Sequence, residues 1–242
     1  MADRERCLVL FSGGRDSWLV AAFLIEQGYK VLLTYFENGA GVGSKNVLHC
    51  VERLIKIYGD CVESLGIISV AGIWREFFQP YVNMTPSEVL KSWGELPVSQ
   101  FHCLTCRSAM YVWSIIKCQR NGIKCVAEGA RRSQSWPIMQ PRMIERFRKL
   151  FDEYSLELLL PVYELESDWT RKNLLLMRGF VPKTLEPQCL IGVPLPDDKS
   201  PPQSVLCAVE SFFDTCILPR ARKLIAEQKD SVDGSRVGRE EV

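Results

Sequence analysis

The sequence contains no long hydrophobic run and no strong excess of either charge. Across its 242 residues there is no uninterrupted apolar stretch of about 18 residues, the length that a membrane-spanning helix needs. The net charge is +1, whereas proteins built mainly to bind nucleic acid carry a clear basic excess. The charged start, Met1 to Arg6, predicts no signal peptide. We therefore expect a soluble, cytoplasmic protein with no membrane partner.

The absence of a secretion signal decides how the ten cysteines are interpreted. In a reducing compartment cysteines are more often buried hydrophobic residues, metal ligands or reactive thiols than members of a disulfide framework. Several lie within apolar strand or helix patterns and are expected in the core, namely Cys7, Cys118, Cys125, Cys207 and Cys216. Any metal-binding or reactive thiols are then expected among the other cysteines.

Short apolar segments alternate with segments of helical periodicity along most of the chain. Strands are expected at 7–11, 30–36, 66–70, 123–128 and 158–163, and helices at 17–27, 45–58, 106–121, 141–152, 168–178 and 203–227. Ser167 is the expected N-cap of the helix at 168–178. This alternation predicts an α/β fold, a doubly wound and mostly parallel sheet with helices on both faces. Ligands of such sheets bind beyond the carboxyl ends of the strands, where the strand order reverses.

Three segments depart from this alternation. Residues 72–102 mix aromatic residues, prolines and short helical pieces, and we expect an irregular excursion over the active face. Prolines at 194–202 separate a main domain over 1–193 from a helical extension over 194–227. The polar tail at 228–242 lacks an apolar period, which predicts disorder.

A glycine-containing loop joins the first expected strand to the first expected helix. It reads Ser12-Gly13-Gly14-Arg15-Asp16-Ser17. The glycines let backbone N–H groups approach an anion, and the helix directs its free N–H groups and positive dipole end at the same point. Ser12 and Ser17 can donate hydroxyl hydrogen bonds to phosphate. Asp16 can orient the loop or hold a magnesium ion that bridges phosphate oxygens.

The motif differs from the two common phosphate loops, because no lysine follows the glycines and there is no G-x-G-x-x-G. S-G-G-x-D-S after an N-terminal strand resembles the PP-loop of the N-type ATP pyrophosphatases, which include tRNA thiolation enzymes, deazaguanine nitrile synthetases and amidating synthetases. The resemblance implies an adenine nucleotide alpha-hydrolase-like, Rossmann-type fold. It also implies ATP with Mg²⁺, cleaved between the α and β phosphates so that AMP is left on the substrate. The plainer alternative is a glycine turn that only joins a strand to a helix.

Cys103 and Cys106 form a C-x-x-C, and a further candidate, Cys189, lies in Glu186-Pro187-Gln188-Cys189-Leu190-Ile191-Gly192. We expect Cys106 in the first turn of the helix at 106–121. There the helix N-terminus and Arg107 would stabilise a thiolate, which makes Cys106 the best candidate for a reactive sulfur. Cys189 is expected at the surface near the strand ends.

In the sulfur-inserting branch of the PP-loop family, two cysteines are placed much like Cys106 and Cys189. The additional Cys103 makes the set similar to members that hold a 4Fe–4S cluster by three cysteines and keep one iron free for a sulfide. Other interpretations stay open. The cysteines can form a persulfide pair, a zinc site with His102, a redox pair of Cys103 and Cys106, or structural thiols.

The same resemblance implies an adenosine site at two strand ends, where Tyr35 and Phe36 end one strand and Gly129 follows another. For Tyr35 and Phe36, a place in the core is an equally good interpretation. Arg131 and Arg132 follow the ligand-side strand end and are candidates for phosphate binding. The basic residues at 142–149 fit a solvated helix face.

Together these patterns and the resemblance imply an ATP-dependent sulfurtransferase that adenylates a carbonyl, releases pyrophosphate and inserts sulfur. Its partners would be a small nucleobase-like substrate or tRNA, and sulfide or a sulfur donor protein; a homodimer is compatible with the sequence. One alternative is nitrogen insertion, as in nitrile or amide synthesis on the same fold. A second is an adenine-nucleotide sensor without catalysis.

Overall fold

Five parallel strands form the central sheet of the computed structural model, which describes residues 4–181, 187–192 and 200–236. In chain order the strands are β1 (Arg6–Leu10), β2 (Lys30–Glu37), β4 (Val62–Ser69), β5 (Cys125–Ala127) and β6 (Glu157–Leu159). Across the sheet they run β4-β2-β1-β5-β6, and every neighbouring pair is parallel. The chain passes from β1 outward to β4 and then crosses to β5 and β6. The strand order therefore reverses beside β1.

Helices cover both faces of this sheet. On one face lie α1 (Arg15–Glu26), α2 (Asn46–Tyr58) and α7 (Asp168–Met177). The other face is covered by α5 (Val98–Asn121) and α6 (Pro141–Asp152), and α3 (Ala71–Val82), α8 (Gln203–Phe212) and α9 (Leu218–Arg236) pack against α5. Successive side chains of β1 point to opposite faces of the sheet and so belong to two separate core clusters. Cys7 and Val9 face α1, whereas Leu8 and Leu10 face α5. The predicted doubly wound α/β fold is confirmed.

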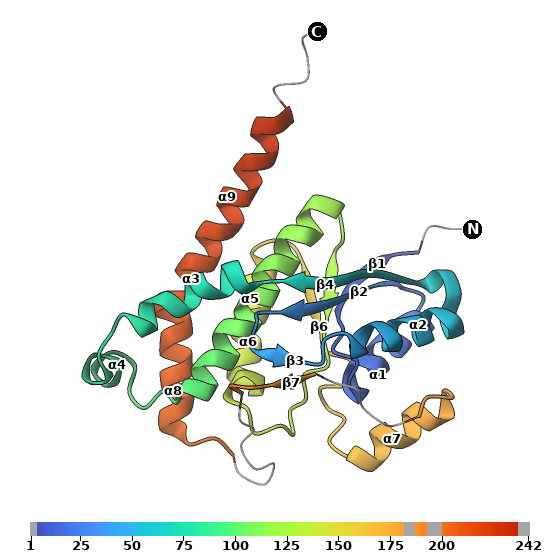
Figure 1. Cartoon of the computed structure of the whole chain (residues 1–242), viewed down its shortest axis with the longest axis horizontal. Helices are drawn as coiled ribbons and strands as arrows, with labels where there is room; N and C mark the ends of the chain where they lie inside the picture. The colour runs from blue at the N-terminus through green and yellow to red at the C-terminus, as the bar shows by residue number, and fades with distance from the viewer. Residues whose placement is uncertain (1–3, 182–186, 193–199, 237–242) are drawn as a thin grey trace.

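A second, two-stranded sheet ties a distant part of the chain to the end of β2. It pairs β3 (Gly41–Val42) with β7 (Gln188–Cys189) in antiparallel register, with Gly41 opposite Cys189. The Leu190 amide also donates to the Ala40 carbonyl at 2.8 Å. Figure 1 shows the two strands side by side. Cys189 is thereby held close to the carboxyl ends of the central strands.

The short helical pieces expected over 72–102 are present, but the expected irregular excursion is wrong, because most of the segment is helical. It contains α3, α4 (Pro86–Trp93) and the first turn of α5, and these helices pack beside α5 and α8. Two of its prolines mark helix starts, and the third, Pro80, lies inside α3. Pro86 follows the N-cap Thr85, whose capping box with Glu88 is complete, and Pro97 is the N-cap of α5. Two 3₁₀ turns elsewhere span Gly59–Cys61 and Pro137–Met139.

Helix α5 begins at Val98, two turns before the expected start, and ends at Gly122 in the left-handed conformation (φ 64°). The placement of Cys106 in a first helical turn is therefore wrong. Its backbone N–H bonds within the helix, so the helix terminus lends no stabilisation to a Cys106 thiolate.

The last expected helix is instead two helices, joined by a π-helical turn at Phe213–Ile217. Side chains of this region, including Val209, Phe212 and Ile217, belong to the same core cluster as α5. Helix α9 continues to Arg236, through residues for which the sequence predicts disorder. The predicted boundary at 193/194 lies outside the described residues. Within the described residues, no helix is long and apolar enough to cross a membrane.

Candidate functional site

The loops that follow β1 and β5 lie against each other at the point where the strand order reverses. A Cβ atom on Gly129 would lie 3.0 Å from the Asp16 Cβ and 3.1 Å from the Ser17 nitrogen. Those distances are tighter than most real Cβ contacts and include backbone atoms, so a side chain at this position would force the two loops a few tenths of an ångström apart. The Ser12–Ser17 loop is thereby fixed at the edge of the sheet where ligands of this architecture bind.

The loop conformation is held by its own hydrogen bonds. Gly13 has φ 76°, and the Gly14 amide donates to the Ser12 hydroxyl at 3.2 Å. The Ser17 hydroxyl donates to the Gly14 carbonyl at 2.9 Å. Gly14 is the N-cap of α1 and supplies no capping side chain, so no side-chain cap competes for the first-turn N–H groups. This geometry, with the helix dipole behind it, can bind an anion.

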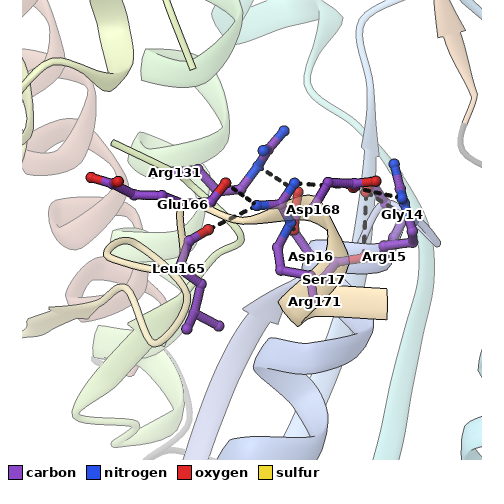
Figure 2. Close-up of polar contacts among 10 residues, drawn as sticks. Gly14, Arg15, Asp16, Ser17, Arg131, Leu165, Glu166, Asp168 and Arg171 are labelled. Atoms are coloured by element: carbon purple, nitrogen blue, oxygen red, sulfur yellow. Dashed lines mark hydrogen bonds and ion pairs between the residues drawn. The ribbon is translucent and has the colours of Figure 1, made fainter. Parts of the chain in front are cut away.

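Asp16 lies between two arginines from different parts of the chain, as Figure 2 shows. Arg131 approaches one carboxylate oxygen at 2.8 Å and Arg171 approaches the other at 3.1 Å. Burial raises the pKa of Asp16, and the guanidinium groups of Arg131 and Arg171 oppose that rise. The Asp16 carboxylate therefore ties the phosphate loop to the loop after β5 and to α7.

Arg171 is the residue of this network that sequence reasoning missed. Its side chain is 4% exposed and also donates to the carbonyls of Leu165 and Glu166, at 2.8 and 2.9 Å. It lies in the first turns of α7, which Ser167 caps as predicted. An arginine among polar helix residues is typical of a solvent-exposed helix face, so the sequence gives no indication that Arg171 is buried.

Arg15 turns away from the loop's backbone and forms an ion pair with Asp168 of α7 at 2.7 Å. Lys172 donates to the same carboxylate at 2.7 Å, and these contacts lower the pKa of Asp168 to about 2. The loop is thus joined to α7 by two separate ion pairs.

A cavity of about 360 Å³ opens beside the loop, on the face of the sheet that α5 covers. Its lining comes from five segments. The strand ends contribute Leu10, Thr34, Tyr35, Phe36 and Glu128, and the phosphate loop contributes Ser12. Helix α5 contributes His102, Cys103, Cys106, Arg107 and Met110. The turn after β5 adds Trp136, Ile138 and Met139, and the segment around β7 adds Cys189 and Gly192. Most of these side chains are apolar, which is usual for a small-molecule site.

All three predicted cysteines line this cavity. Cys103 and Cys106 lie one turn apart on α5, and burial raises the pKa of each thiol to about 12. The exposed Cys189 lies opposite, with its sulfur 3.5 Å from His102 Nε2 and accepting from the Gly192 amide at 3.2 Å. The expected stabilisation of a Cys106 thiolate is wrong, because desolvation outweighs the nearby Arg107.

The cysteines do not form a finished metal site. No three histidine, cysteine, aspartate or glutamate side chains of the described segments are grouped as metal ligands. Their chemistry nevertheless fits a thiolate-bound group, because three sulfurs face one space. A Cβ on Gly192 would lie 3.3 Å from both the Cys103 and the Cys189 sulfur, so the absence of a side chain keeps that space open.

Arg107, expected to support a thiolate, is bound elsewhere. It forms a buried ion pair with Glu128, which also accepts from the Tyr111 hydroxyl at 2.5 Å. Burial disfavours the charge, but the neighbouring carboxylate holds the pKa of Arg107 above its usual value. The Arg107–Glu128 ion pair, whose charges neutralise each other, therefore lines one side of the cavity.

The other predicted residues divide into two groups. Tyr35 and Phe36 line the cavity, and Phe36 also packs edge-on against Trp113 with ring centroids 5.2 Å apart. Arg132 is exposed and pairs with Glu164 at 3.5 Å, away from the loop. Arg131 is therefore the basic residue of this pair that reaches the phosphate loop.

No family model matches the chain, and no curated protein matches it. A solved structure described as a 4-thiouridine synthetase–RNA complex with bound ATP superposes with a TM-score of 0.59 at 12% identity, covering 93% of this chain and 53% of that one. The chain has the adenine nucleotide alpha-hydrolase-like fold. The resemblance to PP-loop ATP pyrophosphatases that the sequence predicts is confirmed at the level of this fold.

Two weaker likenesses to solved structures were also found. The predicted subunit of a tRNA methyltransferase from Methanocaldococcus jannaschii gives a TM-score of 0.45 at 20% identity, covering 70% of this chain and 73% of that one. An NMN synthetase from Francisella tularensis gives 0.38 at 13%, covering 92% and 87%. This chain spans about half of the 4-thiouridine synthetase, 53% of its length.

Proposed function

We propose that the protein is an ATP-dependent enzyme that adenylates a carbonyl oxygen of a nucleobase and replaces that oxygen with sulfur. One observation carries the proposal: Ser12 of the phosphate loop and the three cysteines Cys103, Cys106 and Cys189 line the same cavity. A nucleotide at the loop and a sulfur at the cysteines would then act on one substrate. The fold it shares with a 4-thiouridine synthetase solved with bound ATP supports this proposal.

The chemistry follows in two displacements. The carbonyl oxygen of the substrate attacks the α-phosphorus of ATP, and pyrophosphate leaves toward Ser12, Ser17 and the free N–H groups of α1. Sulfide then attacks the activated carbon and loses its proton. AMP leaves with the former carbonyl oxygen, and a thiocarbonyl remains. Activation divides one difficult substitution into two easier ones.

The residues present fit the two groups that this chemistry needs. ATP would bring Mg²⁺, which neutralises charge on the phosphates. Cys103, Cys106 and Cys189 would hold an iron–sulfur cluster, or zinc in its place, and a cluster with one open iron supplies a bound sulfide. The acceptor is a nucleobase, either free or within tRNA.

The test starts from anaerobically purified protein and measures iron, zinc, acid-labile sulfide and the absorption spectrum. A broad band near 400 nm (roughly, as such clusters show) with matching iron and sulfide supports a cluster at the cysteines. A colourless protein with one zinc would favour nitrogen insertion instead.

The same preparation is incubated with ATP labelled at the α-phosphate, sulfide, and either bulk tRNA or free nucleobases. We expect labelled AMP, pyrophosphate and a thiolated base. Cys106→Ser and Cys189→Ser are expected to abolish thiolation while ATP binding persists. Cys207→Ser is the matched control, because Cys207 is exposed, not in the core as expected, and lies outside the cavity. Normal thiolation by Cys106→Ser or Cys189→Ser would rule out the sulfur step.

A further inference from the structure

The Cys189 sulfur lies against an imidazole ring that comes from a distant part of the chain. His102 Nε2 is 3.5 Å from this sulfur, which also accepts a hydrogen bond from the Gly192 amide at 3.2 Å. Gly192 belongs to the same short segment as Cys189, whereas His102 belongs to α5. The His102 ring therefore links the sulfur of the β7 segment directly to α5.

The His102 ring is held in place by the residues packed around it. His102 is 1% exposed, and Trp74 of α3 packs edge-on against the ring with centroids 5.6 Å apart. The Trp74 indole N–H donates to the Thr105 hydroxyl at 3.1 Å, and this hydroxyl in turn lies 3.0 Å from the His102 carbonyl. Helices α3 and α5 thus fix the ring by contacts that need no ligand.

The polar atoms of the His102 ring have one partner within the part of the chain that the structure describes. Nδ1 is buried and makes no hydrogen bond there, so the Cys189 sulfur at Nε2 is the partner that these residues offer. A neutral imidazole carries one N–H. A cysteine that binds a metal is a thiolate, which needs a donor opposite it. In that state Nε2–H donates and the Cys189 sulfur accepts.

The helix geometry favours a role for His102 beside the cysteines rather than as a fourth ligand. His102 and Cys103 are adjacent in α5, so their side chains leave the helix about 100° apart and are poorly placed to bind one ion together. Cys103 and Cys106 lie one turn apart, and a Cβ on Gly192 would lie 3.3 Å from both the Cys103 and the Cys189 sulfur. The Cys189 sulfur therefore faces the space beside Cys103 while its other contact is with His102.

We propose that His102 is a positioning residue, which donates a hydrogen bond from Nε2 to the Cys189 thiolate and orients that sulfur toward a metal bound together with Cys103 and Cys106. Partners of this kind fix the direction of a metal ligand and stabilise its charge. The inference rests on the proposed function, because it assumes that the three cysteines bind a metal.

The experiment titrates metal-free protein with Co²⁺ in the absence of oxygen and follows the cobalt–thiolate charge-transfer absorption, which reports sulfur ligation. His102→Leu removes the donor, whereas His102→Gln keeps an N–H that can reach the place of Nε2. His49→Leu is the matched control, since His49 is the other histidine of the chain and is exposed on α2. Thermal unfolding of each variant checks the fold.

We expect His102→Leu to raise the Kd for Co²⁺ by about tenfold, the lower end of the range for residues that support a metal ligand. At saturation its charge-transfer band should keep its intensity and move to longer wavelength, because a thiolate without a hydrogen bond gives up electron density more easily. His102→Gln and His49→Leu should match the wild type in both the Kd and the band.

A Kd and a band in His102→Leu equal to those of the wild type would overturn the inference and leave the proposed function standing. Binding by His102→Gln as weak as that of His102→Leu would overturn it too, because His102 would then be a metal ligand itself. If wild-type protein gives no cobalt–thiolate band, the cysteines bind no metal, and the sulfur part of the proposed function fails together with the inference.

Discussion

The two ends of the cavity differ in how far they are already assembled. At the phosphate-loop end, Asp16 contacts both Arg131 and Arg171, and Gly129 closes against the loop backbone. At the cysteine end, the sulfurs of Cys103 and Cys189 face a space that Gly192 leaves open, and the thiols on α5 are held protonated by burial.

The phosphate-loop end and the cysteine end of the cavity differ because different interactions stabilise them. The loop is built from ion pairs and backbone contacts that need no ligand, which is the pre-organisation that anion binding favours. Thiolates, by contrast, are unstable in an apolar pocket until a cation or a metal compensates their charge. We infer that the loop binds its ligand as it stands, whereas the cysteines reach their working arrangement only when loaded.

Gly129→Ala should have the largest effect, because the new Cβ would meet the backbone of the phosphate loop. We expect the Kd for ATP to rise by roughly a hundredfold and the free energy of unfolding to fall by about 1–3 kcal/mol. Calorimetry and urea denaturation measure the two. Gly72→Ala is the control, since a Cβ there meets no atom within 4 Å. It should leave ATP affinity unchanged and should not lower the free energy of unfolding, because Gly72 lies in α3 and alanine favours a helix. Normal ATP binding by Gly129→Ala would contradict the pre-formed loop.

Arg171→Met should come next, because it leaves the half-buried Asp16 carboxylate with Arg131 as its remaining close partner. We expect a loss of about 2–3 kcal/mol in the free energy of unfolding, somewhat below the cost of breaking a fully buried pair. Arg132→Met breaks an exposed pair and should cost less than about 0.5 kcal/mol. Equal losses in the two variants would remove the structural role assigned to Arg171.

Alkylation by iodoacetamide should separate the cysteines by pH. The thiolate is the reacting form, and a pKa of about 12 leaves roughly one Cys106 in ten thousand ionised at pH 8. The rate at Cys106 should therefore rise about tenfold per pH unit above pH 8, toward pH 12, as long as the fold persists. Peptide mass spectrometry compares Cys106 with the exposed Cys207, which should react much faster at pH 8. Equal rates at pH 8 would show an ionised Cys106.

Gly192→Ala should have the smallest effect on stability, below about 1 kcal/mol, since the sulfurs it approaches belong to movable side chains. Its ATP affinity should match that of the wild type. Its iron or zinc content after anaerobic purification should fall, because the new methyl group occupies the space between Cys103 and Cys189. Full metal content would show that this space is not where the metal binds.

The sequence predicted the preassembled end well because its signals are local. The loop Ser12–Ser17, the strand before it and the helix after it are adjacent in the chain, and Ser167 correctly marks the start of α7. The ion pair of Asp16 with Arg171 could not be predicted, since the two residues are far apart in sequence and only the packing of α7 against α1 joins them.

The cysteine end was predicted only in part. The gathering of Cys103, Cys106 and Cys189 at one cavity agrees with the pattern, but the helix around Cys106 begins two turns earlier than expected. The prolines of the segment before it do not interrupt the helices, since Pro86 and Pro97 mark helix starts and Pro80 lies inside α3. The pairing of Arg107 with Glu128 likewise depends on tertiary contact.

The central claim is that the nucleotide and the cysteines share one cavity, and the rate of Cys189 alkylation with and without saturating ATP tests it most directly. Cys189 is exposed and lines the cavity, whereas Cys207 is exposed and lies outside it. We predict that ATP slows modification of Cys189 and leaves Cys207 unchanged. An unchanged rate at Cys189, under ATP concentrations that calorimetry shows to be saturating, would mean that the nucleotide lies elsewhere and would contradict the account.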